Sequence, residues 1–303
     1  MKNFENHIPV MLKEVLQYLN PKSNELYADC TFGAGGYTEA ILKQANCSVI
    51  GLDRDSSVQE FANKIKKDFQ NRFEFYNVKF SDIENILNGR KLDGMVLDIG
   101  VSSMQIDNAD RGFSFQKDSK LDMRMGNNSL SAYDIVNNSN EQELANIIYN
   151  YGDEVKSRHI AKKIIEKRKE KPIETTFELA DIVRYFYPKR EGKIDPATKT
   201  FQAIRIAVND ELSELKKILE LSKKILNKNG RLVVVSFHSL EDEIVKGFVK
   251  KETNKGIKKD KYSKDKNTYN FNLLTKKVVV PTEEEVRKNV RARSAKLRAL
   301  QKC

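Results

Sequence analysis

The chain has 303 residues, enough for two domains or for one domain with a large insertion. Its 54 Lys and Arg residues outnumber 43 Asp and Glu, and the net charge of +11 is typical of a protein that has a polyanionic partner or is simply very soluble. Three widely spaced cysteines, no apolar core in the first ten residues and no run near the ~20 apolar residues of a membrane span predict a cytoplasmic protein without disulfides, metal site or membrane anchor.

Short apolar runs alternate with longer amphipathic stretches in the first third of the chain, from Glu25 to about Gly100. The runs LYADC, SVIGLD, RFEFYNV and LDGMVLDIG are predicted strands, with helices between them. Such alternation is typical of a parallel sheet with helices on both faces, so we predict a doubly wound, Rossmann-like α/β fold.

The pattern changes to helices over residues 107–208. One helix begins after Thr175, where Thr-x-x-Glu forms a capping box. The next carries Phe201 and Ile204 on its apolar side and is expected to continue to Lys228, where Asn229-Gly230 ends it. The apolar run RLVVVSF then restores the strand pattern.

The predicted domains follow from this interruption. Residues 1–106 and 209–303 form one discontinuous α/β domain that binds the cofactor, and residues 107–208 form a helical insertion that recognises the substrate. A segment rich in Lys, Asn and Asp, residues 250–277, is expected to be an exposed loop.

A glycine-rich turn, DCTFGAGGY over residues 29–37, joins the first predicted strand to the first helix. Such a turn lets the backbone approach a ligand and directs a helix N-terminus at it. Asp53 ends the second strand, where its carboxylate can accept hydrogen bonds from both hydroxyls of a ribose. Thr38 stands where a dinucleotide fingerprint needs glycine, which favours S-adenosylmethionine over a nicotinamide cofactor.

Several unusual strings occur along nearly the whole chain. They are HIPVM (7–11), LDIGVSS (97–103) with Gln105, RGFSF (111–115), LDMRM (121–125), TFQAIR (200–205), SFHSLED (236–242) and RARS (291–294). Together they closely resemble the bacterial family that methylates the exocyclic amine, N4, of a cytidine in 16S ribosomal RNA of the small ribosomal subunit. The chain departs from that pattern at Tyr37, where histidine is common, at Met104 and Lys120, which replace prolines, and at Lys199, which replaces arginine.

The resemblance implies a class I methyltransferase sheet and a set of cofactor contacts. Those contacts fall on Gly35, Gly36 and Tyr37 in the turn, Asp53 at the ribose, Phe80 near the adenine, and Asp98 and Gln105 after the fourth strand. By default, Phe80 is a core aromatic, and only the resemblance gives it a role at the adenine.

Methyl transfer from a sulfonium is an in-line displacement, which depends mainly on positioning. The cytosine amine is a poor nucleophile, and acceptors that draw its protons out of the ring plane would activate it. Many amino-methyltransferases carry an Asp/Asn/Ser-Pro-Pro-aromatic tetrapeptide after the fourth strand, where this chain has Asp98-Ile99-Gly100-Val101. The candidate catalytic residues are Asp98 and His238, although Asp98 could instead cap a turn and His238 could be structural.

Charged residues elsewhere suggest contacts of two kinds. Arg111, Asp122 and Arg124 are expected to form an ion-pair network inside the insertion. The chain after Glu285 has no acidic residue and carries Arg287, Lys288, Arg291, Arg293, Lys296, Arg298 and Lys302. Residues 250–266 add eight lysines against three acids, near Tyr262 and Tyr269, so both segments are expected to contact RNA phosphates.

Two other functions fit part of the same pattern. One is a methyltransferase that acts on DNA amines, and the other is a non-catalytic ribosome-assembly factor that keeps S-adenosylmethionine as a structural ligand. Nothing in the sequence favours a particular oligomeric state.

Overall fold

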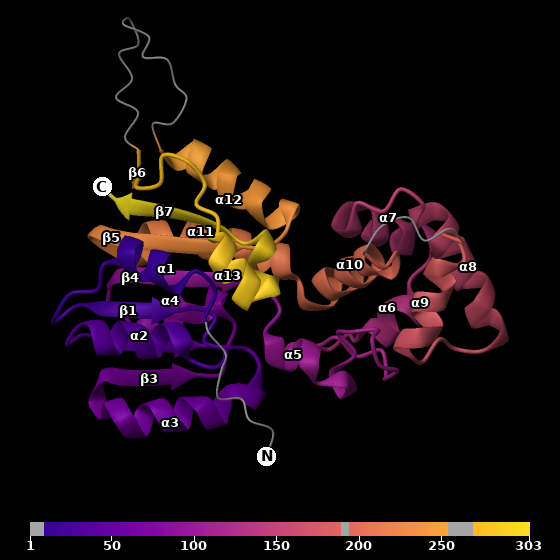
Figure 1. Ribbon diagram of the computed structural model, residues 1–303, viewed down its shortest axis with the longest axis horizontal. Helices are drawn as coiled ribbons and strands as arrows, with labels where there is room; N and C mark the ends of the chain where they lie inside the picture. Colours follow the sequence, from indigo (N-terminus) through magenta and orange to yellow (C-terminus); the bar gives the residue numbers. More distant parts are fainter. Residues whose placement is uncertain (1–8, 189–193, 254–268) are drawn as a thin grey trace, which may run out of the picture. The chain divides into compact units, whose positions relative to one another are not determined.

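The computed structural model describes residues 9–188, 194–253 and 269–303. The chain divides into two compact units, one of Met1–Gly100 with Leu212–Cys303 and one of Val101–Glu211. Figure 1 colours them along the chain, the second unit lying in the magenta to salmon range. Each has a hydrophobic core of its own.

The first unit is built on a seven-stranded sheet with the strand order β3-β2-β1-β4-β5-β7-β6 (Figure 1). The strands are β1 (Leu26–Asp29), β2 (Ser48–Leu52), β3 (Phe73–Tyr76), β4 (Leu92–Ile99), β5 (Leu226–Ser236), β6 (Phe271–Leu273) and β7 (Lys296–Lys302). Strands β1 to β5 are parallel, and β7 runs antiparallel to both of its neighbours. The predicted doubly wound α/β fold is confirmed, and its strand order reverses at β1 and β4, where sheets of this type bind ligands.

Helices cover both faces of the sheet. They are α1 (Leu12–Leu19), α2 (Gly36–Gln44), α3 (Gln59–Phe69), α4 (Ile83–Leu87), α11 (Glu211–Ile225), α12 (Ser239–Glu252) and the short α13 (Glu283–Lys288). One core cluster joins α4, α11 and α12 to alternate strand residues, among them Met95 and Leu97. Because successive side chains of a strand point to opposite faces, buried Val96 belongs to the other face, on the side of α1, α2 and α3.

Within the described residues, the regular secondary structure of the second unit is helical. They are α5 (Ser103–Asp107), α6 (Ala132–Asn138), α7 (Glu141–Gly152), α8 (Ser157–Glu170), α9 (Thr176–Arg184) and α10 (Ala197–Asn209). The predicted capping box of α9 is present, since Thr175 accepts from Glu178 N and Glu178 accepts from Thr175 N. Leu121 and Met123 complete the core that α6 to α10 form.

The prediction of one long helix from Phe201 to Lys228 is wrong. Helix α10 ends at Asn209, because Asp210 adopts a left-handed conformation with φ 50° and donates its N–H to Ile206 O. Helix α11 ends at Ile225, and β5 starts before Asn229-Gly230 because Leu226 pairs with Leu92.

The strands β6 and β7 were not predicted. Strand β7 lies between β5 and β6 and buries Leu297, Ala299 and Leu300, although its sequence is largely basic. In the part of the chain that the structure describes, no helix has the length and apolar character that a membrane crossing requires.

Candidate active site

The glycine turn is held tightly by its surroundings. Gly35 has φ 78°, and a Cβ there would lie 2.3 Å from Ile65 Cδ1, while a Cβ at Gly36 would lie 2.2 Å from Pro9 Cγ. No side chain fits either position without displacement of its neighbours. The turn therefore brings bare backbone to the carboxyl end of β1, and α2 begins at Gly36 with its N–H groups at that edge.

Asp29, at the end of β1, ties the turn to the sheet. It is fully buried and accepts hydrogen bonds from Thr38 Oγ1 at 2.8 Å and from Thr31 N at 3.3 Å. Burial raises the pKa of Asp29 to about 6, against the lowering effect of these hydrogen bonds. Sequence reasoning missed Asp29, whose only signal was its place before the turn, and Thr38 has a structural role as its donor.

Asp53 follows β2 and contacts the same turn. Its Oδ2 accepts from Gly33 N at 2.8 Å and its Oδ1 from Asp55 N at 2.9 Å. Burial raises the pKa of Asp53 to about 6, and the two N–H donors act in the opposite direction. Each carboxylate oxygen accepts one of these bonds and keeps a second lone pair, so the group can still accept two ribose hydroxyls.

Phe80 lies beyond the end of β3, in a short helical turn, Phe80–Asp82. It is partly buried and packs against the core of the first unit, which is the default role of such an aromatic. Asn77, also after β3, donates from Nδ2 to Asp53 O at 2.8 Å, so the ends of β2 and β3 are joined. Asn77 was not singled out from the sequence.

The Tyr37 hydroxyl has two hydrogen-bond partners, one of which is Asp98. The buried Tyr37 hydroxyl contacts Val10 O and lies 3.2 Å from Asp98 Oδ2. Both oxygens can accept the hydroxyl proton, so Tyr37 donates either to the Val10 carbonyl or to the Asp98 carboxylate. Burial raises the pKa of Asp98 to about 7, with Tyr37 opposing and with Asp29 and Glu241 adding to the rise.

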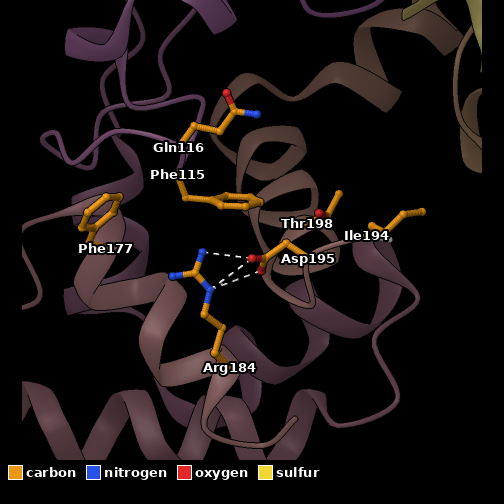
Figure 2. A pocket seen from close by; sticks show the side chains of 7 residues that line it. All are labelled: Phe115, Gln116, Phe177, Arg184, Ile194, Asp195 and Thr198. Carbon is orange, nitrogen blue, oxygen red and sulfur yellow. Dashed lines mark hydrogen bonds and ion pairs between the residues drawn. The ribbon is translucent and has the colours of Figure 1, made fainter. Parts of the chain in front are cut away.

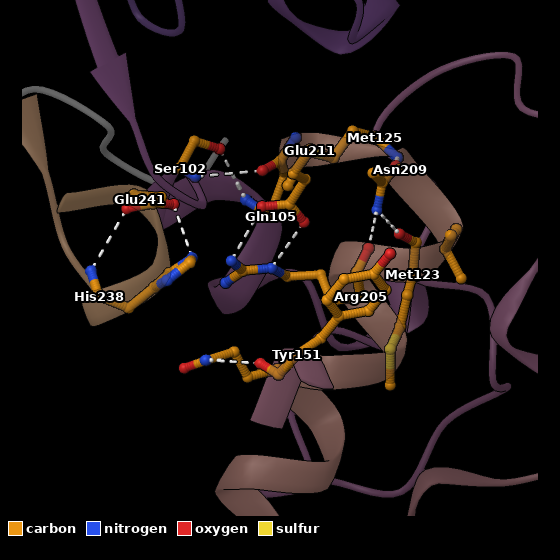
Figure 3. A network of polar contacts seen from close by, with 12 residues as sticks. Ser102, Gln105, Met123, Met125, Tyr151, Arg205, Asn209, Glu211, His238 and Glu241 are labelled. Atoms are coloured by element: carbon orange, nitrogen blue, oxygen red, sulfur yellow. Dashed lines mark hydrogen bonds and ion pairs between the residues drawn. The ribbon is translucent and has the colours of Figure 1, made fainter. Parts of the chain in front are cut away.

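His238 lies between β5 and α12 and faces Glu241 (Figure 3). His238 Nε2 is 2.8 Å from Glu241 Oε1, and Glu241 Oε2 accepts from Phe237 N at 2.8 Å and from His238 N at 3.3 Å. Glu241 is fully buried. It was not predicted, although an acidic residue three positions after an N-cap is the spacing of a capping box.

The sheet brings most of the candidates to one edge. Ile99 pairs with Ser236, so Asp98 near the end of β4 and His238 just after β5 lie on neighbouring parallel strands, and a Cβ at Gly100 would lie 3.0 Å from the Phe237 ring. Gly35, Gly36, Tyr37 and Asp53 lie at the same carboxyl edge of β1 and β2.

Gln105 belongs to the second unit. It is buried in α5, where it forms a capping box with Ser102: Ser102 N donates to Gln105 Oε1 at 3.1 Å and Gln105 N donates to Ser102 Oγ at 3.2 Å.

Polar contacts inside the second unit explain several of the unusual strings (Figure 3). Buried Asn209 holds the LDMRM string, donating to Met123 O at 2.7 Å and accepting from Met125 N at 2.9 Å. Arg205 makes a two-point ion pair with Glu211 at 2.8 and 2.9 Å.

The predicted network of Arg111, Asp122 and Arg124 is confirmed in part, as an ion pair of Asp122 with Arg124 to which Arg111 adds a hydrogen bond to the backbone. Arg124 Nε and Nη2 contact the two oxygens of Asp122 at 2.8 and 2.7 Å, and Arg111 donates to Arg124 O at 2.7 Å. The ion pair with Arg124 lowers the pKa of Asp122.

A pocket of about 590 Å³ lies within the second unit (Figure 2). Its lining residues are Phe115, Gln116, Phe177, Arg184, Ile194, Asp195 and Thr198. Arg184 contacts Asp195 and Asp181, each at 3.0 Å, and its guanidinium lies 5.7 Å from the centre of the Phe115 ring. Because these acids neutralise Arg184, the pocket suits a flat uncharged group better than a phosphate.

Part of the basic C-terminal run is engaged within the protein. Arg298 Nη2 and Lys296 Nζ contact Asp242 at 2.9 and 3.2 Å, which lowers the pKa of that carboxyl. Strand β7 places these two cations beside α12, and the expectation that this run contacts RNA phosphates stays a prediction. Most of the lysine-rich segment, including Tyr262, and the first two residues of the HIPVM string lie outside the described residues.

The fold and the carboxyl edge of its parallel strands define the class of protein. A doubly wound sheet with a bare glycine turn after β1 and a carboxylate after β2 is a binding site for an adenosine-containing cofactor. The model of the MraW methylase family matches residues 4–303, so the chain belongs to that family. It is therefore a methyltransferase, and its methyl donor is S-adenosylmethionine, as predicted.

Individual relatives agree over the full length. The chain is 55% identical to ribosomal RNA small subunit methyltransferase H of Rickettsia prowazekii (strain Madrid E), covering 98% of both chains. It is 53% identical to the protein of the same name from Rickettsia bellii (strain RML369-C), again covering 98% of both. Among solved structures, an rRNA methylase from Streptococcus thermophilus aligns over 96% of this chain and 93% of its own, with 10% identity and a TM-score of 0.40.

Proposed function

We propose that the protein transfers a methyl group from S-adenosylmethionine to the exocyclic amine, N4, of one cytidine in 16S ribosomal RNA, and that it does so in the cytoplasm. The observation that carries the proposal is the edge at β1, β2, β4 and β5, where Asp53, Asp98 and His238 follow strands of a methyltransferase sheet. The names of the full-length relatives supply the substrate class.

The chain's residues fit the cofactor in the order that the strands present them. The turn at Gly35 and Gly36 has no room for side chains of its own and offers backbone N–H groups to the methionine end. Asp53 retains two lone pairs for the ribose, and Phe80 would lie beside the adenine. The Tyr37 hydroxyl contacts Val10 O, so the contact of Tyr37 with the cofactor would come from its backbone. Gln105 would add a contact from the second unit.

The bound cofactor supplies an electrophilic methyl group on a sulfonium. Asp98 then has two tasks that require its ionised form: its negative charge favours the cationic ligand, and its oxygen can accept a proton-donating contact from the cytosine amine. His238, oriented by Glu241, is the candidate acceptor for the second amine hydrogen. Such contacts concentrate electron density on the nitrogen, which is what the reaction needs.

The second unit is proposed to recognise the substrate. It carries no part of the β1 to β5 edge, and its pocket presents Phe115 and Phe177 to a flat group such as an unpaired base. RNA helices hide their base edges in a deep groove, so the target cytidine would have to be unpaired or extruded.

The test is a mass comparison of small-subunit RNA from cells with and without the protein. The expected result is a loss of one methyl group, located on cytidine N4, when the protein is absent, and its return when the purified protein and S-adenosylmethionine are added. A methyl group that appears on DNA instead would support the DNA alternative. An unchanged RNA mass together with a defect in subunit assembly would support the non-catalytic assembly factor.

A further inference from the structure

A row of three aromatic residues follows α9 and contacts the side of α8. Lys156 Nζ lies 3.9 Å from the centre of the Tyr187 ring, the His159 ring lies 6.1 Å from that of Phe186, and Lys163 Nζ lies 5.5 Å from that of Tyr185. Lys156, His159 and Lys163 thus each face one aromatic ring of the row.

Tyr185 differs from the other two aromatics of the row in its exposure. The side chain of Tyr187 donates to Glu154, and Phe186 packs against the core of the unit. Tyr185 keeps 68% of its surface exposed while its ring is fixed edge-to-face on Phe186, with centres 5.2 Å apart, and by Lys163. A ring that is both fixed and open to solvent is a platform on which another flat group can stack.

The exposed surface of α8 is strongly basic. Residues 156–171 contain eight Lys and Arg but two acids, Glu166 and Glu170, which pair with Lys163 and Lys167. Arg158, Lys162 and Lys169 are exposed and, at spacings of four and seven residues, share one stripe of the helix. Lys162 and Lys169 have no acidic partner among the described residues.

We propose that this α8 face, made of Tyr185 with Arg158, Lys162 and Lys169, is a docking surface for single-stranded or loop RNA. The stripe would track phosphates while one unpaired base stacks on Tyr185. Charge complementarity selects a polyanion, and the exposed ring selects one that has unpaired bases. The inference rests on the proposed function, because it takes the RNA to be the region around the methylated cytidine.

The experiment measures the affinity of the full-length protein for a labelled 16S RNA fragment, by fluorescence anisotropy over a series of salt concentrations. Tyr185→Ala should weaken binding on the order of 10-fold without changing the salt dependence, whereas Tyr185→Phe should retain the affinity. The triple variant Arg158→Ala/Lys162→Ala/Lys169→Ala should reduce the slope of log K against log salt by about 2, since each lost phosphate contact removes roughly 0.7.

The matched control changes two exposed lysines of the first unit, Lys64→Ala/Lys67→Ala on α3, and should alter neither affinity nor slope. Unchanged thermal midpoints show that the variants are folded. The proposal would be overturned if every variant bound the RNA with wild-type affinity. It would also be overturned if the variants lost binding to phosphatidylserine vesicles while their RNA binding stayed intact. Methyl transfer by the wild-type protein is measured separately. If no cytidine is methylated but the α8 variants bind RNA weakly, the proposed function fails and the docking surface stands.

Discussion

Asp98 is the residue whose protonation connects structure to activity. Its pKa of about 7 lies far above that of an unfolded Asp, so the folded protein holds a proton that the unfolded chain releases near pH 4. The stability of the cofactor-free protein therefore falls as pH rises from about 4 through 7. Asp98→Asn keeps an acceptor for the Tyr37 hydroxyl and should be more stable than the wild type by roughly 1 to 3 kcal/mol at pH 8, and equal to it near pH 4, in urea unfolding.

The same proton predicts how cofactor binding depends on pH. S-adenosylmethionine is cationic, so its affinity should rise as pH increases through about 7 and Asp98 ionises, and binding below pH 7 should release a proton. Calorimetry in two buffers of different ionisation enthalpy measures that release. Asp98→Asn should bind weakly at all pH values, and a wild-type affinity that stays constant from pH 5 to 8 would contradict the assignment.

Asp53 is expected to contribute through hydrogen bonds to the ribose. Asp53→Ala should weaken cofactor binding by about 1.5 to 3 kcal/mol, the range for bonds to a charged acceptor. The variant also removes the acceptor for Gly33 N, so Asp55→Ala, which removes the neighbouring acceptor for Ser57 N, is the control. Equal affinities of the wild type and Asp53→Ala in calorimetry would place the ribose elsewhere.

At the scale of the element, β7 joins β6 to β5 and so extends the sheet. Leu297 is fully buried between β5 and Val279, with Val279 N donating to Leu297 O at 3.0 Å. Leu297→Ala should lower the free energy of unfolding by about 2 to 5 kcal/mol, because it leaves a cavity in the core. Urea unfolding measures this, and Lys288→Ala on exposed α13 should change stability by less than ~0.5 kcal/mol.

At the scale of the whole molecule, the net charge of +11 predicts a strong dependence of activity on salt. Phosphate contacts release counterions, so methylation of small-subunit particles should fall steeply as salt rises from about 50 to 200 mM. Initial rates at fixed S-adenosylmethionine measure the effect. Cofactor affinity over the same range is the control and should change far less, since its bonds form at a partly buried site.

The substrate should be recognised by shape as well as by charge, because phosphate contacts carry no sequence information. Short unstructured cytidine oligomers are therefore expected to be poor substrates compared with small-subunit particles. Measurement of kcat/KM for both substrates tests this expectation. Equal values would show that folded RNA context is unnecessary, and a methyl group on ring carbon 5 would contradict the reaction class, since Cys30 is buried in the sheet and its thiol pKa is raised by burial.

The sequence by itself determined the features that are local in the chain. Strand and helix periods identified β1 to β5, the turn at Gly35 and the carboxylate of Asp53 follow directly from strand ends, and Thr175 marks its own helix start. These signals lie within a few residues of the structure they specify. Asp98 and His238 were named as candidates because unusual strings surround them, and their roles stay predictions.

Only the tertiary structure decided what depends on distant partners. Leu297 and Arg298 form an interior strand because β5 and Asp242 meet them there, while the sequence alone favoured a basic run that contacts RNA phosphates. The pKa of Asp98 depends on burial, on Tyr37, which is 61 positions away in the chain, and on Asp29 and Glu241. Tyr185 becomes an exposed platform through Lys163 on another helix. Burial and pairing arise only when the chain packs, so the apolar periodicity of the sequence does not predict them.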